Sequence, residues 1–309
     1  MERTIRLGTR GSKLALWQAH HVKDRLQRTT PGLSVSVVVI KTTADVATDK
    51  PLARFGSQGV FVKELEAALL EGAIELAVHS LKDVPTALAP GLVLGAILER
   101  EDPRDTLVTP EGCKLGSLAE GAVVGTSSPR RVAQLLNLRP DLVLKDIRGN
   151  LDTRLRKMES GEFHALVLAR AGLKRLAPAG VREIPFNHDE MLPAPGQGAI
   201  AIELRSDDEA TRGLLGPLHH DETARSVAAE RAVLAALGGG CQLPVGCLAT
   251  VNSRGKVVLR AVVADRRGRK LLRAESTGTD PVLVGDRLAE KLRFLGADIL
   301  LKESDGEGQ

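Results

Sequence analysis

LGTRGSKLA, at residues 7–15, and VGTSSPRRVA, at residues 124–133, are the two stretches that decide the fold. In each, an apolar strand-like run reaches a Gly-Thr pair, a turn of small residues follows, and a basic helical segment begins. After both stretches, short β-branched runs alternate with amphipathic runs, a pattern typical of strand–helix–strand units in a mainly parallel sheet. The sequence therefore predicts an α/β protein with two similar lobes.

The expected elements follow the same order in both lobes. The first lobe has strands predicted at residues 3–8, 34–41 and 74–79 and helices at 13–27 and 60–71, with Ser12 as the first helix cap. The second has strands predicted at 122–125, 142–147 and 165–169 and helices at 128–138 and 151–159. Residues 199–204, AIAIEL, are mostly apolar and predict a strand that rejoins the first lobe.

The alternation of strands and helices ends near residue 221. A long helix ends in a glycine run, a strand at 257–264 leads to a hairpin at 266–268, and a last helix covers 280–295. Two short segments, 99–105 and 193–199, suit hinges better than flexible linkers. We therefore expect domain 1 at 1–98 with 199–216, domain 2 at 105–192, and a small α+β domain 3 at 221–309.

The amino-acid composition argues against a nucleic-acid-binding protein and against a membrane protein. The 43 basic residues barely exceed the 39 acidic ones, and aromatic residues make up 2% of the chain with no tyrosine. A protein that binds nucleic acid usually has a denser basic face or aromatic platforms, so we expect no nucleic-acid partner. The N-terminus lacks an apolar signal core, no apolar run is long enough to span a membrane, and cysteine is sparse, so we expect a soluble cytoplasmic protein without a membrane partner.

One of the three cysteines has an unusual setting. Cys241 follows three glycines, Gly238 to Gly240, whereas Cys113 and Cys247 have no such neighbours. A helix C-cap and a turn account for one or two of these glycines. A loop thiol can also ionise and act as a nucleophile or an attachment point. The pattern alone leaves both interpretations open.

Arginines recur just after the predicted strands, where the carboxyl edges of an open α/β sheet line a cleft. This set consists of Arg10, Arg130, Arg131, Arg148, Arg154 and Arg175. Hydroxyl groups stand beside them at Ser12, Thr126, Ser127 and Ser128. Solvated surface arginines are the ordinary alternative, but the repetition favours a small anion with several charges. No phosphate-binding glycine motif is present, and a polycarboxylate fits forked guanidinium groups at least as well.

The segment VHSLKDVP, residues 78–85, places Lys82 and Asp83 just past the end of an apolar strand. The alternative to a functional role is a turn with an exposed charge pair. At the sheet edge, Asp83 would face the same cleft as Arg10 and could stabilise a developing cation or move a proton. The His219-His220-Asp221 run suits a helix start better than a metal site, so we predict no metal.

Taken together, these motifs resemble the porphobilinogen deaminase, or hydroxymethylbilane synthase, family. The resemblance runs in order from about residue 3 to residue 265 and includes LGTRGSKLALWQAH, GVFVKELEAALLEG, AVHSLKDVPT, VGTSSPRR, IRGNLDTRLRK, APGQGA, HHDETARSVAAERA and GGGCQLPVG. It implies a transferase that joins four porphobilinogen molecules head to tail with loss of ammonia and releases hydroxymethylbilane for tetrapyrrole biosynthesis. It also implies a monomer with two periplasmic-binding-protein-like lobes, a cleft between them, and a small C-terminal domain.

The same resemblance implies roles for individual residues. A dipyrromethane cofactor is held by a thioether to the cysteine that matches Cys241. Asp83 matches the essential aspartate, with Lys82 beside it, and Phe61 matches a phenylalanine that packs on a ring. Cofactor carboxylates are assigned to Arg130, Arg131, Arg148, Arg154 and Arg175 with Ser12, Thr126, Ser127 and Ser128, and substrate binding to Arg10, Arg148, Arg154 and Phe61.

One segment departs from the common family pattern. PLARFGSQG, residues 51–59, has Arg54 and Gln58 where some members have two lysines, so a carboxylate contact at position 58 is not expected. We expect residues 42–59 to form a mobile lid. Two other function classes stay open on the residues alone: a binding module for small dicarboxylates, which leaves the GGGC run unexplained, and a thiol acyltransferase, which lacks an obvious histidine base near Cys241.

Overall fold

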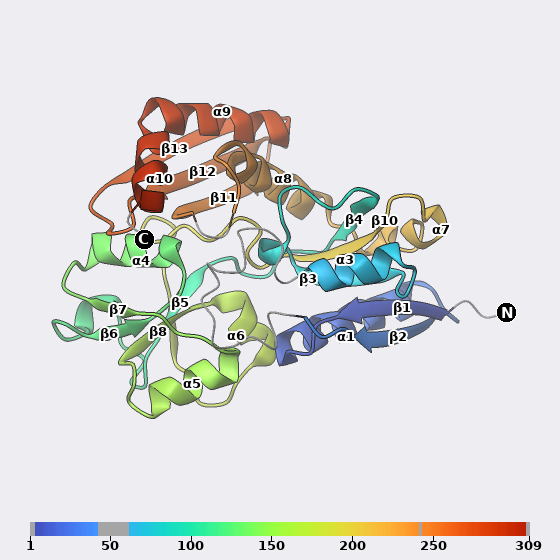
Figure 1. Cartoon of the computed structure of the whole chain (residues 1–309), viewed down its shortest axis with the longest axis horizontal. Helices are drawn as coiled ribbons and strands as arrows, with labels where there is room; N and C mark the ends of the chain where they lie inside the picture. The colour runs from blue at the N-terminus through green and yellow to red at the C-terminus, as the bar shows by residue number, and fades with distance from the viewer. Residues whose placement is uncertain (1–3, 43–61, 241–242, 307–309) are drawn as a thin grey trace. The chain divides into compact units, whose positions relative to one another are not determined.

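The computed structural model describes residues 4–42, 62–240 and 243–306 (Figure 1). Two compact units make up the chain, one of residues 1–101 with 198–224 and one of residues 102–197 with 225–309. Two of the three boundaries, after residues 101 and 197, fall inside the segments predicted as hinges, and the third follows residue 224. The further division of the second unit into two domains, and the cleft expected between the lobes, stay predictions. No helix within the described ranges is long and apolar enough to cross a membrane.

The first unit contains a five-stranded sheet in the order β2-β1-β3-β10-β4. Its strands are β1 (Thr4–Thr9), β2 (Ser34–Val39), β3 (Leu76–Ser80), β4 (Leu92–Ile97) and β10 (Ile200–Arg205). β1 runs parallel to β2 and β3, whereas β10 runs antiparallel to both β3 and β4. The predicted return strand is confirmed as β10, and the sheet is mainly parallel as predicted, with β10 running opposite to the other four strands. β10 enters the sheet from residue 198 without a crossover helix, so nothing forces it to be parallel.

Helices cover both faces of this sheet. They are α1 (Lys13–Thr29) and α3 (Lys63–Leu70), with the short elements η2 (Leu81–Asp83), α7 (Glu209–Arg212) and η4 (Gly216–Leu218). The Ser12 Oγ atom accepts the Ala15 N–H at 3.3 Å, which confirms the predicted cap. Alternate residues of β3 point to opposite faces, so Leu76 packs in the α1 cluster and Ala77 in the α3 cluster.

The second unit repeats this arrangement in a sheet of order β7-β6-β8-β5-β9. Its strands are β5 (Asp105–Val108), β6 (Val123–Gly125), β7 (Val143–Lys145), β8 (Ala165–Ala169) and β9 (Glu183–Pro185), and its helical elements are η3 (Leu115–Ser117), α4 (Pro129–Leu138), α5 (Leu151–Glu159) and α6 (Arg170–Leu176). β6 is parallel to β7 and β8, and β5 is antiparallel to β8 and β9. Each sheet thus has three parallel strands followed by an antiparallel one, which confirms the two similar lobes.

A three-stranded antiparallel sheet completes the second unit. It contains β11 (Val245–Val251), β12 (Val257–Ala264) and β13 (Leu271–Gly278), and the helices of this region are α8 (Asp221–Ala236), α9 (Pro281–Phe294) and α10 (Ala297–Gly306). The predicted hairpin is confirmed, since the Gly268 N–H closes the turn on the Asp265 carbonyl at 3.0 Å. Residues from α8, α9 and the sheet form one apolar core, with Val233, Leu259 and Leu288 fully buried.

Candidate active site

A pocket lies where β1 and β3 end in the first unit. Because these neighbouring strands are parallel, their carboxyl ends meet at one edge of the sheet. The turn after β1 supplies Arg10 and Ser12, and η2 supplies Asp83 directly after β3. The described residues lining the pocket are Arg10, Ser12, Leu14, Ala15, Gln18, Val62, Val78, His79, Ser80 and Asp83. The structure thus brings together three of the predicted site residues, whereas Lys82 is not among those lining the pocket.

Hydrogen bonds from two other segments hold the edge of the sheet where β3 ends. The Gln18 amide of α1 donates to the Ser80 hydroxyl at 2.8 Å. The Leu81 N–H donates to the Ala199 carbonyl at 3.0 Å, which ties η2 to the segment before β10. A Cβ atom on Gly8 would lie 2.3 Å from Ile74 Cδ1, so a larger residue there would require that side chain to shift. The residues just before Asp83 are therefore tied to α1 and to the segment before β10.

A buried acid lies behind the pocket. His79 Nε2 and Glu203 Oε2 are 3.0 Å apart, with 3% and 0% of their side chains exposed. Glu66 of α3 stands nearby: burial, and then the negative charge of Glu203, raise the pKa of Glu66 above its ordinary value. Sequence analysis did not single out Glu203, although an acidic residue inside the apolar run AIAIELR was a usable signal.

In the second unit, two of the predicted arginines pair with one buried carboxylate. Arg130 Nη1 donates to Asp105 Oδ2 at 2.5 Å, and Arg131 Nη2 donates to Asp105 Oδ1 at 2.7 Å. Arg131 Nη1 also donates to the Val167 carbonyl, and Arg130 Nη1 to the Leu192 carbonyl. Asp105 has no exposed surface, and both guanidinium groups are almost fully buried.

The charges of this cluster do not balance. Burial alone would raise the pKa of Asp105, but Arg130 and Arg131 outweigh it and hold that pKa well below its usual range. Burial lowers the pKa of Arg131, and the Asp105 carboxylate only partly offsets this effect. Two guanidinium groups therefore share one carboxylate in a setting that disfavours net charge, and such a cluster attracts an anion.

Arg148 and Arg154 lie close to this cluster. Burial first, and then the charge of Arg131, lower the pKa of Arg154 to about 10. The Arg154 Nε atom donates to the Gly149 carbonyl at 2.9 Å, and Arg148 Nε is 3.2 Å from Asp146 Oδ2. The charge of Arg148 also acts on Arg154. The structure thus gathers Arg130, Arg131, Arg148 and Arg154 in one region, while Arg175 lies half-buried on α6.

The hydroxyl groups predicted beside these arginines hold the turn before α4. The Ser127 hydroxyl donates to the Ile147 carbonyl at 2.6 Å and accepts the Ile147 N–H at 3.1 Å. Thr126 is buried, and its Oγ1 atom accepts the Ser128 N–H at 3.3 Å. Ser128 is the cap residue of α4 but makes no side-chain cap bond. Thr126 and Ser127 therefore fix the backbone from which Arg130 and Arg131 project.

Cys241, Phe61 and most of the segment 42–59 lie outside the described residues. The flanks of Cys241 are described: α8 ends at Ala236, and β11 begins at Val245. Gly238, Gly239 and Gly240 all have positive φ angles, of 101°, 55° and 144°. Three such residues in succession favour glycine. The Gly239 N–H closes the end of α8 on the Leu234 carbonyl at 2.8 Å, as a helix cap does, and the role of the run in presenting Cys241 stays a prediction.

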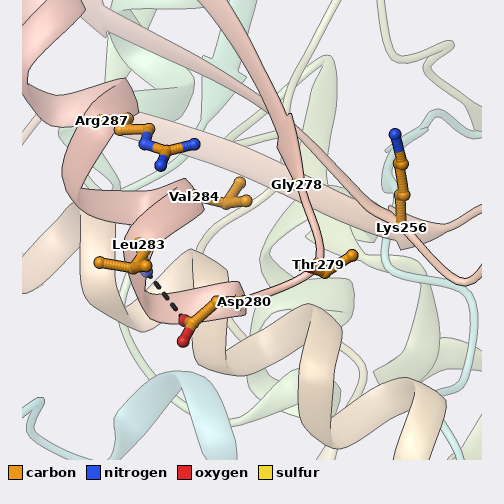
Figure 2. A pocket seen from close by; sticks show the side chains of 7 residues that line it. All are labelled: Lys256, Gly278, Thr279, Asp280, Leu283, Val284 and Arg287. Atoms are coloured by element: carbon orange, nitrogen blue, oxygen red, sulfur yellow. Dashed lines mark hydrogen bonds between the residues drawn. The ribbon is translucent and has the colours of Figure 1, made fainter.

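A second pocket lies at the start of α9 and is lined by Lys256, Gly278, Thr279, Asp280, Leu283, Val284 and Arg287 (Figure 2). The Asp280 carboxylate already caps this helix, accepting the Val282 and Leu283 N–H groups at 2.9 and 3.0 Å. Lys256 and Arg287 are exposed. The N–H groups at the start of α9 therefore already have a carboxylate partner, so this pocket gives no reason to expect a bound anion. In the part of the chain that the structure describes, no group of three or more metal-binding side chains occurs.

Comparison with known proteins identifies the family. A family model described as "Porphobilinogen deaminase, dipyromethane cofactor binding domain" matches residues 5–213, and one described as "Porphobilinogen deaminase, C-terminal domain" matches residues 224–293. The porphobilinogen deaminase of Moorella thermoacetica is 51% identical over 97% of this chain and 96% of its own length. The chain belongs to the porphobilinogen deaminase family. The porphobilinogen deaminase of Pelotomaculum thermopropionicum is 50% identical to this chain over 99% of both chains.

The family assignment confirms the predicted enzyme class and the dipyrromethane cofactor, and it decides against a dicarboxylate-binding module and a thiol acyltransferase. Solved structures with a similar chain trace include the periplasmic VFT2 domain of Bordetella pertussis BvgS, at 15% identity, 72% and 90% coverage of the two chains, and a TM-score of 0.42. The described residues fit the cofactor, because a porphobilinogen-derived dipyrromethane carries several carboxylates and the Arg130–Arg131–Asp105 cluster holds an excess of buried positive charge.

Proposed function

We propose that this chain performs the family reaction, the head-to-tail joining of four porphobilinogen molecules with loss of ammonia, with Cys241 as the attachment point and Asp83 as the central acidic group. The observation that carries the assignment of residues is the pocket at the end of β3, where Arg10, Ser12 and Asp83 converge. A carboxylate next to a guanidinium group and helix N–H groups can bind a substrate that has carboxylates and a cationic centre.

The cofactor would be held by two kinds of contact. The Cys241 thiol forms the covalent link, and the glycine run before it gives the backbone the conformations that this mount requires. Arg130, Arg131, Arg148, Arg154 and Arg175 would neutralise carboxylates, with Ser12, Thr126, Ser127 and Ser128 as polar neighbours. When bound, the dipyrromethane supplies a nucleophilic pyrrole carbon on which the product is built.

Residues of both units are assigned to the incoming substrate. Arg10 binds a carboxylate of porphobilinogen, with Arg148 and Arg154 as further partners, and Phe61 packs on a ring. The Asp83 carboxylate accepts pyrrole N–H groups and stabilises positive charge as the carbon–nitrogen bond breaks. Lys82, adjacent to Asp83, meets a substrate carboxylate.

Intact-mass spectrometry tests the attachment. Wild-type protein should carry the added mass of two pyrrole units, and added porphobilinogen should produce further species, each heavier by one pyrrole unit. The Cys241→Ser variant should lack the primer mass, with Cys113→Ser as the matched cysteine control. An active wild-type preparation whose Cys241 peptide is unmodified would contradict the proposal.

A second variant tests Asp83. Asp83→Asn keeps the shape of the side chain but removes its charge, so turnover should fall by roughly 10²–10⁴-fold while the primer mass and the thermal midpoint stay unchanged. Asp24→Asn, an exposed residue of α1, is the control. Normal turnover of the Asp83 variant would refute its role.

We also propose that the chain works as a cytoplasmic monomer without nucleic-acid or membrane partners, which its modest charge and sparse cysteine support. Light scattering measures the oligomeric state directly, and cell fractionation measures the location in the cell.

A further inference from the structure

A third pocket lies on the three-stranded sheet, on the face turned away from α8 and α9. Its volume is about 300 Å³, and the described residues that line it are Leu192, Arg260, Ala261, Arg273, Ala274 and Glu275. All of them belong to the second unit. Pockets for small organic molecules begin at about this volume, so a single ring with its side chains fits here and a chain of several rings does not.

Strand register places the charged side chains of this pocket on one face of the sheet. Arg260 of β12 is opposite Glu275 of β13, and Arg273 is opposite Val262. Residues directly opposite each other share a face, and so do residues two apart in one strand. Val262 packs with Leu192 in a small apolar cluster on the same face. The pocket therefore combines an apolar floor with two guanidinium groups and one carboxylate.

The charges around the pocket are not paired with their nearest neighbours. Arg260 Nη2 lies 2.5 Å from Asp189 Oδ1, although Glu275 is directly opposite Arg260. This pair leaves 39% and 83% of the two side chains exposed, so it is weak and can open for a ligand. Across the residues that the structure describes, the side chains of Arg273 and Glu275 make no hydrogen bond or ion pair.

The two guanidinium groups also repel each other. Burial, and then the positive charge of Arg260, lower the pKa of Arg273 below its ordinary value. A carboxylate bound between these groups would relieve the repulsion and supply the partner that Arg273 lacks.

The floor of the pocket is held by the buried arginine cluster. Leu192 is 1% exposed, and its carbonyl accepts Arg130 Nη1 at 2.8 Å and Gln134 Nε2 at 3.0 Å. Its N–H group donates to Gln134 Oε1 at 2.9 Å. Because these contacts fix Leu192 before a ligand binds, little ordering of the floor opposes binding.

A ligand for this pocket needs two carboxylates, one cationic group and an apolar ring. Guanidinium groups match carboxylates, and Glu275 with Asp189 matches an ammonium group. Porphobilinogen has this pattern, since its single pyrrole ring carries two carboxylate side chains and a protonated aminomethyl group.

We propose that this pocket is a second binding site for porphobilinogen, separate from the residues assigned to the reaction. Arg260 and Arg273 bind its carboxylates, Glu275 binds its ammonium group, and the ring lies on Leu192. No bond of the ligand breaks there. The site needs neither Asp83 nor Cys241 in the roles proposed for them.

Nuclear magnetic resonance of full-length, cofactor-loaded protein labelled with ¹⁵N tests the site without measuring activity. Each arginine gives an Nε–H signal, and those of Arg260 and Arg273 are identified by their absence from the Arg260→Lys and Arg273→Lys variants. The probe is the aminoethyl homologue of porphobilinogen, whose amine lies one carbon further from the ring and cannot be expelled. Glutamate has the same charged groups without the ring, and glutarate also lacks the ammonium group. Ionic strength is kept constant.

The homologue should shift both signals to saturation, with glutamate binding more weakly and glutarate more weakly still. Arg273→Gln should raise the Kd read from the Arg260 signal by roughly 10-fold or more, because a charge-assisted contact is lost. Glu275→Gln should weaken binding of the homologue and glutamate but not of glutarate. Arg254→Gln, which removes an exposed arginine of the β11–β12 turn, should leave the Kd unchanged.

Several results would overturn the inference. Signals that do not shift, or that shift without saturation as they do with sodium chloride, would mean that no site exists. A wild-type Kd in Arg273→Gln would place the ligand elsewhere. Glutamate binding as tightly as the homologue would exclude porphobilinogen as the occupant, and glutarate doing so would exclude the contact with Glu275. The mass test of the proposed function uses other residues, so either proposal can fail alone.

Discussion

At the scale of single residues, Asp105 carries more interactions than its place in the sequence indicates. Arg130, Arg131 and Gln197 all donate hydrogen bonds to its carboxylate. Gln197 also donates to the Pro103 carbonyl at 2.8 Å. One buried carboxylate thus holds two arginines in place and ties them to the segment that precedes residue 198.

Replacing this carboxylate should therefore destabilise the protein strongly. The Asp105→Asn variant leaves two guanidinium groups buried without a counter-charge, and breaking such a pair costs about 3–5 kcal/mol. Urea unfolding followed by circular dichroism measures the loss. Glu209→Gln, which breaks an exposed pair with Arg212, should change stability little. Equal effects of the two substitutions would contradict the importance of burial here.

The pairing of Asp105 with Arg130 and Arg131 also predicts how stability depends on pH. Because the pKa of Asp105 is lowered in the folded protein, its contribution to stability is present above its ordinary value in the unfolded chain, about 3.9, and is lost as the pH falls below it. The stability difference between the wild type and Asp105→Asn should stay constant from about pH 5 to pH 8 and shrink below about pH 4. A difference that grows on acidification would reverse the assigned sign.

Sequence reasoning found some of these residues and missed others for a physical reason. Arg10 and Asp83 could be placed together because each follows a strand of one sheet, and neighbouring parallel strands end at one edge. Asp105 was assigned to a charged hinge, and Glu203 to an apolar strand. Their partners, Arg131 and His79, are 26 and 124 positions away in the chain. Such pairs depend on strand register, which composition and spacing do not contain.

At the scale of elements, the β12–β13 hairpin packs on the helix that carries the arginine pair. A Cβ atom on Gly268 would lie 2.1 Å from the Ala133 carbonyl oxygen, and the Asn137 amide donates to the Gly268 carbonyl at 3.0 Å. The hairpin turn therefore touches α4 backbone to backbone. This contact joins the three-stranded sheet to the lobe within the second unit.

A pair of glycine substitutions isolates this contact. Gly268 and Gly255 both occupy hairpin turns with positive φ angles, of 66° and 68°, but nothing lies within 4 Å of a Cβ atom on Gly255. Gly255→Ala should cost about 1–2 kcal/mol, since alanine is strained in the left-handed region. Gly268→Ala should cost clearly more, because the hairpin must also move away from α4. Urea unfolding compares the two, and equal losses would show that the contact contributes nothing.

Most of the longer helices were predictable, but β4, β5, β9 and β11 were not predicted. Periodic apolar positions and caps located α1, α4, α5 and α9, and α5 covers the predicted residues 151–159. The directions of β5 and β10 were not predictable, because alternation in a strand carries no information on its partner. β9 has three residues, and β5 begins in the charged segment 99–105, so neither gives a clear apolar signal.

At the scale of the whole molecule, the candidate residues are divided between the two units. Arg10, Ser12 and Asp83 belong to the first, whereas Cys241 and the arginine cluster belong to the second. The repeated stretches at 7–15 and 124–133 predicted both lobes, but they did not indicate that each sheet contains one antiparallel strand, β10 in the first and β5 in the second. Neither unit alone contains every residue assigned to the reaction.

This division predicts how the cofactor affects stability. The second unit contains the buried Arg130–Arg131–Asp105 cluster with its excess positive charge, and Arg154 adds a further guanidinium group whose pKa burial lowers to about 10. An attached polyanion compensates this charge in the folded state only. The cofactor-free Cys241→Ser protein should therefore unfold at a lower temperature than the loaded wild type. Each kcal/mol lost corresponds to roughly 2–4 °C in a domain of 150–250 residues.

Scanning calorimetry on samples of known mass measures this difference. Cys113→Ser retains the primer and should match the wild type, which separates loss of cofactor from loss of a cysteine. Arg154→Gln in the Cys241→Ser background then tests the cause. Removing one of the uncompensated charges should raise the midpoint of the cofactor-free protein, because the repulsion with Arg131 disappears. The same substitution in loaded protein should lower the midpoint, since a carboxylate contact is lost. A change of the same sign in both backgrounds would mean that the cluster does not hold the cofactor.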